Sequence, residues 1–365
     1  RPTRHPYVVQ LDVALAGRVD PDRLHSAVQT VLARHPNVAA RFVYREVDEP
    51  VQVLLADPVA PWRFVDLTGD NADSDESIGA ICAAERAAVA DLAGQCPLRG
   101  VLIRTGAEDY RLVVTNHHLV LDGWSLPIVL GEIMAGYGGQ PVAAPTPYRG
   151  FVAWLAGQDV EAATSAWGDL FAGFEAPTLV GPPQRLGFAA RAVHLVQLSA
   201  ASSGALTELA RAQHTTVNIV LQGAWAQLLC WLTGQHDVAF GTTVSGRPGE
   251  VAGADSMVGL LINTVPVRAV LTATTTTADL LGQLQTFHND TLDHQHLALS
   301  EIHRITGHDS LFDTLFVYEN YPFDASLQAG EVAITAISGR EFNHYPLTLQ
   351  VTPGPQLDLR VEYAT

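Results

Sequence analysis

One stretch rich in proline and glycine divides this chain into two parts with the same kind of pattern. Residues 177–187 contain three prolines and two glycines, a composition typical of a loop or linker. On both sides of it, valine-rich segments mix with segments whose apolar residues recur at helical spacing. The 365 residues also suit two units at about 150 residues each. We therefore predict an α+β fold with an N-terminal lobe over 1–176, a linker over 177–190 and a C-terminal lobe over 191–365.

The expected strands and helices do not alternate regularly enough to require a doubly wound parallel sheet. Asp20 followed by Pro21 predicts the start of the first helix, and Ser125 is predicted to cap the third. In the N-terminal part we expect strands at 7–15, 41–45, 50–55, 98–104 and 110–115, and helices at 21–34, 75–92, 126–137 and 150–172. In the C-terminal part we expect strands at 193–198, 238–243, 260–267, 314–318, 332–337, 347–351 and 357–363, and helices at 203–213, 217–232, 277–292 and 300–305.

The charge of the chain excludes two classes of partner. The formal net charge is −17, with 38 acidic residues against 21 basic ones, all of them arginine. Duplex DNA and anionic membrane surfaces both require clustered cations, so we expect neither as a partner. The longest apolar stretch, 219–232, is interrupted by Gln222 and Gln227. We therefore expect no transmembrane helix.

The cysteines and the N-terminus indicate the compartment. Cys82, Cys96 and Cys230 are odd in number and have no CxxC spacing, which is typical of buried thiols in a reducing cytosol. No signal peptide is expected, because residues 1–4 lead directly into a strand-like segment. The exclusive use of arginine and the abundance of alanine and valine suggest a GC-rich genome. We predict a cytoplasmic bacterial protein.

The strongest local motif is HHLVLDG, in which two adjacent histidines, His117 and His118, precede Asp122 and Gly123. The motif follows a predicted strand and precedes a helix whose positive end faces back toward it. A neutral imidazole in this position suits removal of a proton from an amine or alcohol, and backbone N–H groups there could stabilise an oxyanion. Two core histidines beside a turn are the competing interpretation of the motif taken alone.

Other chemistries are poorly supported. Adjacent histidines on a strand point to opposite faces, and His294 with His296 has no further metal ligands at the right spacing, so we expect no metal. The segment 241–246 is one residue too long between glycine and serine for GxSxG. Neither a Walker A nor a GxGxxG sequence is present, so nucleotide binding is not expected.

The wider context changes the balance between these interpretations. Seven motifs in order resemble the core motifs of condensation domains from non-ribosomal peptide synthetases, and the resemblance runs from about residue 10 to residue 363. The motifs lie at 34–42, 117–125, 148–154, 245–248, 258–268, 294–297 and 311–322.

The resemblance implies a fold and a reaction. The expected fold is two chloramphenicol-acetyltransferase-like lobes in a V-shaped pseudo-dimer, with the active site in a tunnel between them. An upstream peptidyl carrier protein would deliver a peptidyl or aminoacyl thioester, and the α-amine of an aminoacyl thioester on a downstream carrier would attack it. Both substrates would arrive on phosphopantetheine arms, an adenylation domain would lie adjacent, and the domain would need no cofactor of its own. Orientation, one proton acceptor and oxyanion stabilisation are sufficient for such a reaction.

The resemblance also implies roles for single residues. His118 matches the catalytic histidine, which either takes the proton of the amine or positions the amine. His117 is expected to be structural, and Asp122 to fix the loop through a salt bridge, with Arg247 as its expected partner and Arg41 or Arg34 as competitors. Gly123 is expected to give backbone access to the reacting carbonyl. Supporting positions are Trp124 and Ser125 at the helix start, and Asn263 and Thr264 in the tunnel, with Tyr318, Asn320 and Tyr321 expected to be structural.

Three further features concern the subtype. Leu121 before the aspartate and the segments 318–322 and 344–349 resemble domains that accept a D-configured upstream residue. An epimerisation domain of the same fold and a non-catalytic docking scaffold are the alternatives, although the intact HHxxxDG favours catalysis. The family's first motif is not found, and the last helical segment of the family is expected to be missing beyond Thr365.

Overall fold

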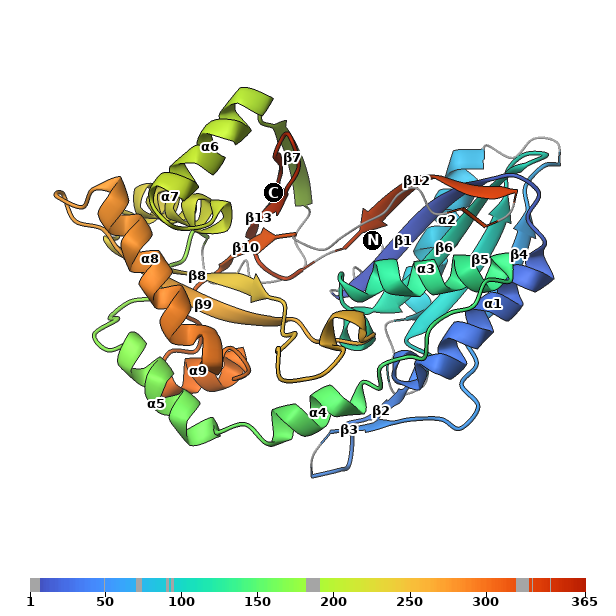
Figure 1. Ribbon diagram of the computed structural model, residues 1–365, viewed down its shortest axis with the longest axis horizontal. Coiled ribbons are helices and arrows are strands. Elements are labelled where there is room, and N and C mark those ends of the chain that lie inside the picture. Colours follow the sequence, from blue (N-terminus) through green and yellow to red (C-terminus); the bar gives the residue numbers. More distant parts are fainter. Residues whose placement is uncertain are drawn as a thin grey trace. The chain divides into compact units, whose positions relative to one another are not determined.

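The computed structural model of the chain describes residues 7–48, 50–69, 74–89, 92, 95–181, 191–319, 328–329, 331–341 and 343–365. These residues form two compact units (Figure 1). The first comprises residues 1–153, 247–261 and 321–343, and the second comprises 154–246, 262–320 and 344–365. The predicted linker lies mostly outside the described residues, so that boundary stays a prediction. Residues 247–261 and 321–343, which the sequence prediction placed in the C-terminal lobe, group with the first unit.

The first unit contains a mixed six-stranded sheet with the strand order β11-β12-β1-β6-β5-β4. Its neighbours pair antiparallel, except β4 and β5, which are parallel. Its strands are β1 (Val8–Ala16), β4 (Trp62–Asp66), β5 (Leu98–Arg104), β6 (Asp109–His117), β11 (Gln328–Ala329) and β12 (Val332–Arg340), and a separate hairpin is formed by β2 (Arg41–Val43) and β3 (Val51–Val53). Its helices are α1 (Pro21–Arg34), α2 (Ser74–Ala88) and α3 (Ser125–Gly138), with short 3-10 turns at Pro36–Ala39, His118–Val120 and Ala254–Ser256.

Strand alternation decides how helices cover this sheet. Leu11, Val13 and Leu15 of β1 share one face and pack in the core with α1 and α3, while α2 covers the opposite face (Figure 1). The predicted start of α1 is confirmed, because the Asp20 carboxylate accepts backbone N–H groups of the first turn and Pro21 follows it. Strand β6 ends at His117, so His117 and His118 lie where the chain leaves the sheet.

A carboxylate ties α1 to α3 on the packed face. The Arg34 Nε donates to Glu132 Oε2 at 2.8 Å, and His35 Nε2 lies 3.0 Å from the same oxygen. Burial lowers the pKa of the His35 imidazole, although the Glu132 charge opposes this shift. The contact fixes the position of α3, whose first turn carries the site.

The second unit contains another mixed six-stranded sheet, ordered β7-β14-β13-β10-β8-β9. Strand β10 is parallel to both of its neighbours, and the other pairs are antiparallel. Its strands are β7 (Arg191–Gln197), β8 (Asp237–Val244), β9 (Asn263–Val270), β10 (Thr314–Tyr318), β13 (Leu347–Thr352) and β14 (Asp358–Ala364). Its helices are α5 (Val160–Leu170), α6 (Ala200–Ala212), α7 (Val217–Thr233), α8 (Thr277–Thr291) and α9 (Leu299–Thr306), with a 3-10 turn at Leu292–His294.

In three regions the structure differs from what the sequence predicted. The single helix expected at 150–172 is two helices, α4 (Arg149–Ala156) and α5, because Asp159 caps a new helix by accepting the Ala162 N–H at 2.9 Å. Strand β4 was not predicted, because its residues do not alternate between buried and exposed. Strand β12 is present as predicted but pairs with β1 of the first unit.

Among the described residues, no helix is both long enough and apolar enough to cross a lipid bilayer.

Candidate active site

Strand pairing sets the position of the two histidines. Strand β6 lies between β1 and β5, so its backbone is held on both sides as far as its last residue, His117, which faces Val8 of β1. The chain then enters the 3-10 turn His118–Val120 and reaches α3 within five residues. A short connection between two packed elements leaves the HHxxxDG loop little conformational freedom.

His117 is held in a neutral form. Its Nδ1 accepts the backbone N–H of Leu119 at 3.1 Å, which closes the 3-10 turn. Burial, together with the charge of His118, lowers the pKa of His117 to about 4. A nitrogen that already accepts a backbone N–H is occupied in holding the turn, as the structural role predicted for this residue requires.

His118 is held differently from its neighbour. Its backbone N–H donates to the carbonyl of Tyr7 at 2.6 Å, and its Nε2 lies 3.3 Å from Oε1 of Glu341. Burial alone would lower the pKa of His118, but the Glu341 hydrogen bond and charge, a hydrogen bond to its own backbone and the Asp122 charge together raise it. The side chain retains 15% exposure. His118 is therefore an anchored imidazole that can still exchange a proton with a bound molecule.

Asp122 is the centre of a buried hydrogen-bond network. Its carboxylate is fully buried and accepts the Ser125 backbone N–H at 2.8 Å and the Ser125 hydroxyl at 2.6 Å. The Leu261 N–H donates to it at 3.0 Å, and the Arg247 guanidinium lies 3.3 Å away. Arg247 is thereby confirmed as the predicted partner, while the competitor Arg34 pairs with Glu132.

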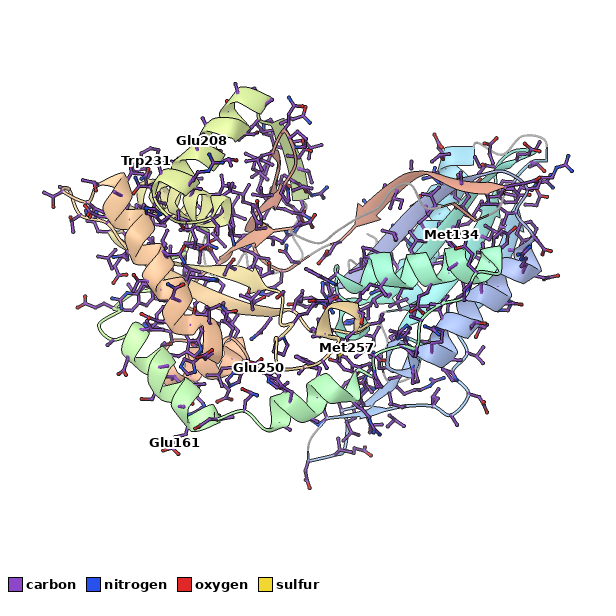
Figure 2. All side chains as sticks on the ribbon, in the orientation of Figure 1. Met134, Glu161, Glu208, Trp231, Glu250 and Met257 are labelled. Atoms are coloured by element: carbon purple, nitrogen blue, oxygen red, sulfur yellow. The ribbon has the colours of Figure 1, made fainter. Side chains whose placement is uncertain are left out.

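Arg247 connects Asp122 to a segment from far along the sequence. The guanidinium donates to the carbonyls of Ala254 and Met257, the latter at 2.9 Å, and lies 5.2 Å from the centre of the Trp124 ring. Burial lowers its pKa, and the Asp122 charge opposes this shift. Met257, labelled in Figure 2, is fully buried in this segment. Residues 247–261 thus wrap onto the HHxxxDG loop within the first unit.

The start of α3 differs from the prediction. Trp124, not Ser125, occupies the capping position and makes no side-chain capping bond. The Ser125 hydroxyl instead donates to Asp122 and accepts the Gly259 N–H at 3.1 Å, so the network occupies it. The Trp124 indole N–H donates to the Asp255 carbonyl at 3.0 Å. The φ angle of Gly123 is not positive, so its backbone conformation does not itself require glycine.

Three residues to which the sequence analysis gave no role also contact the site, namely Gly259, Tyr148 and Glu341. Gly259 allows close packing, since a Cβ there would lie 2.3 Å from the Tyr148 ring. The Tyr148 hydroxyl donates to the Leu260 carbonyl at 2.6 Å, and burial raises the pKa of Tyr148 to about 12. Gly259 lies inside the motif at 258–268, and this place in a motif is the sequence signal that could have identified it. Glu341 belongs to none of the seven motifs.

The remaining predicted positions belong to the second unit or lie outside the described residues. Asn263 donates from Nδ2 to the carbonyls of Gln295 and Leu297, both at 2.8 Å, and its Oδ1 accepts the Thr264 N–H. Its amide is therefore occupied in holding a turn of the second unit. Tyr318 ends β10, and residues 320 and 321 lie outside the described part of the chain.

The described residues contain no group of three or more histidine, cysteine, aspartate or glutamate side chains placed to hold a metal ion.

Comparisons with known proteins agree on one family. Residues 1–365 match the family described as "Condensation domain". Chondramide synthase cmdD of Chondromyces crocatus is 35% identical over 98% of this chain, and bacitracin synthase 1 of Bacillus licheniformis is 31% identical over 99%. The chain spans only 9% and 7% of the length of these relatives.

A solved structure shows the same fold. The first condensation domain of the calcium-dependent antibiotic synthetase, in complex with a substrate analogue, superposes with a TM-score of 0.75 at 21% identity. The match covers 98% of this chain and 86% of that one. The predicted α+β class is therefore confirmed, with two mixed sheets.

The network around Asp122 predicts a stability effect. Removal of one member of a buried ion pair leaves an uncompensated charge, so Asp122→Ala and Arg247→Ala should each lower the free energy of unfolding by about 3–5 kcal/mol. The double variant should cost less than the sum of the two, because neither charge then remains unpaired. Urea titrations of the four proteins measure this coupling. Strictly additive losses would contradict a direct interaction.

The environment of His117 predicts a dependence of stability on pH. Its pKa in the folded chain is about 4, below the ordinary value of 6.5, so the unfolded chain binds more protons between these values. His117 therefore makes stability fall as the pH falls from 6.5 to 4, by up to about 3 kcal/mol. His117→Asn keeps an acceptor for the Leu119 N–H but cannot titrate. Urea titrations at pH 7 and 4.5 should show a smaller loss in the variant; an equal loss would refute this assignment.

Proposed function

The chain belongs to the condensation-domain family of the non-ribosomal peptide synthetases, a family of peptide-bond-forming domains, and we propose that His118 is the residue that takes the proton of the attacking amine. The observation that carries this proposal is the anchored, partly exposed His118 imidazole within the rigid HHxxxDG loop. General acid–base catalysis needs a proton acceptor at a fixed position. The pairing of β6 with β1 and β5 holds the backbone that leads into His118, which supports this role.

The proposed reaction joins two thioester-bound substrates. The α-amine of an aminoacyl group on a downstream carrier protein attacks the thioester carbonyl of the donor on an upstream carrier protein. A C–N bond forms, the amine proton moves to His118, and the C–S bond breaks. The departing sulfur takes up a proton and leaves as the free thiol of the donor's phosphopantetheine arm. The products are one amide and one thiol, and no oxidant or reductant takes part.

The other site residues support this step in our proposal. Asp122 and Arg247 hold the loop, and Ser125, Trp124 and His117 fix its ends. Gly123, which precedes the Trp124 N-cap of α3, would give the reacting carbonyl close access to the backbone.

The larger context remains a proposal drawn from the family. It comprises lobes at 1–176 and 191–365 in a V, joined by a linker at 177–190, with Asn263 lining a tunnel between them. An adjacent adenylation domain and a bacterial cytoplasmic location belong to the same proposal. The three cysteines, which are free thiols in the structure, are compatible with that location.

Replacement of His118 tests the catalytic assignment. Loss of a general base typically costs 10²–10⁴-fold, so His118→Ala should reduce amide formation by about that factor. The measurement is single-turnover product formation with loaded donor and acceptor carriers. His194→Ala changes an exposed histidine on β7 of the second unit and is the matched control, expected to keep the wild-type rate. Full product from His118→Ala would disprove the assignment.

The configuration of the donor is a second proposal. Leu121 before the aspartate and the segments 318–322 and 344–349 favour a D-configured upstream residue. Discrimination by a shaped site is often 10–200-fold, so kcat/KM for a D-configured donor should exceed that for its L-isomer by at least about tenfold. Competition between the two loaded donors for one acceptor carrier measures the ratio. Equal use of both donors, or preference for the L-isomer, would contradict the subtype.

A further inference from the structure

Sheet register brings a carboxylate from the end of β12 to the catalytic loop. Arg340, the last residue of β12, pairs with Gln10 of β1, and Val8 of β1 pairs with His117 of β6. Strands β12 and β6 both run antiparallel to β1, so both leave the sheet at the same end of β1. The first residue after β12 is Glu341. It therefore reaches the same place as the residue that follows β6.

The contact made there is specific to one atom of the imidazole. The Nε2 of His118 lies 3.3 Å from Oε1 of Glu341, while the other stabilising hydrogen bond of the imidazole is to its own backbone. Nε2 is thus the nitrogen that faces outward from the loop. The Glu341 side chain is 51% exposed, so its contact with Nε2 lies where solvent, and therefore a bound substrate amine, can approach.

We propose that Glu341 is a positioning residue for the reaction: its carboxylate orients the Nε2 side of His118 and accompanies the imidazolium that forms when the amine's proton is transferred. This inference rests on the proposed function of His118. During the step, the proton moves from the attacking nitrogen to Nε2 as the C–N bond forms, and the carboxylate stays ionised throughout. The Glu341 carboxylate balances the positive charge created on the imidazole, so solvent does not have to stabilise it.

The titratable groups around the imidazole leave this role to Glu341. Within the described part of the first unit, the titratable residues that contact His118 or act on its charge are Tyr7, His117, Asp122 and Glu341. Burial raises the pKa of Tyr7, so its hydroxyl stays neutral, and His117 is neutral above about pH 4. The Asp122 carboxylate pairs with Arg247, and it also accepts hydrogen bonds from the Ser125 N–H, the Ser125 hydroxyl and the Leu261 N–H. Of the two carboxylates, Glu341 makes the direct contact with Nε2.

The consequence is a pH dependence with a definite sign. A carboxylate beside an imidazole favours its protonated form and raises its pKa. The neutral imidazole, which accepts the proton, is then populated only at higher pH. Without the carboxylate, the acidic limb of the pH–rate profile should move to lower pH.

Three substitutions test the role of Glu341. Glu341→Gln removes the charge and keeps the shape, Glu341→Asp keeps the charge, and Glu331→Gln removes one charge immediately before the other end of β12 as the matched control. The titration midpoint of His118 is measured by NMR on the chain with ring-labelled histidine, the signal being assigned by its loss in His118→Ala. Amide formation is measured over the same pH range with loaded carriers.

We expect the midpoint of His118 to fall in Glu341→Gln, to stay above that value in Glu341→Asp, and to remain at the wild-type value in Glu331→Gln. In Glu341→Gln, the acidic limb of the pH–rate profile for amide formation should also move to lower pH. The plateau rate should stay within about tenfold of wild type. An unchanged midpoint in Glu341→Gln, or an equal fall in Glu331→Gln, would overturn the role of Glu341. A lowered midpoint in a chain that makes no amide would uphold the pair and overturn the condensation reaction instead.

Discussion

The buried ion pair between Asp122 and Arg247 is the interaction on which the HHxxxDG loop depends. Removing both charges from water costs several kcal/mol per ion, and the structure offsets this with a nearly complete set of partners. The aspartate accepts from Ser125 and Leu261, and the arginine donates to two backbone carbonyls. Because these partners come from α3 and from residues 247–261, the pair joins segments 125 positions apart in the sequence. The loop that carries His118 is therefore held both by α3 and by residues 247–261.

The two adjacent histidines show how the surroundings decide the pKa of a side chain. They are chemically identical, yet the pKa of one falls to about 4 while the pKa of the other rises. His117 is buried and accepts a backbone N–H, so its neutral form is favoured. His118 faces Glu341, so its charged form is favoured. Adjacent imidazoles at a strand end can therefore have pKa values shifted in opposite directions, one because it is buried and holds the turn and the other because it contacts a carboxylate.

Sequence reasoning succeeded where the determining interactions are local. The Asp20–Pro21 start of α1 and the strand before the histidines follow from capping and alternation, which involve near neighbours. The Arg247 pairing was available only through the ordered motifs. Ser125 was misjudged as a cap because its hydroxyl bonds to Gly259, 134 residues away. Glu341 could not be predicted, because its place depends on the register of β12 against β1, and register is a property of the folded sheet.

The path of the chain has a consequence for recombination between synthetases. Strand β12 and residues 247–261 belong to the first unit, although they follow most of the second in sequence. A crossover at 177–190 would give the first unit two foreign strands, β11 and β12, and a foreign partner for Asp122. In every hybrid made there, β1 and the HHxxxDG loop come from one parent, whereas Arg247 and β12 come from the other. The two parental sequences must therefore still form the Asp122–Arg247 pair and the β1–β12 register. The residues that hold the HHxxxDG loop therefore lie on both sides of such a junction, and exchange of the whole domain keeps them together.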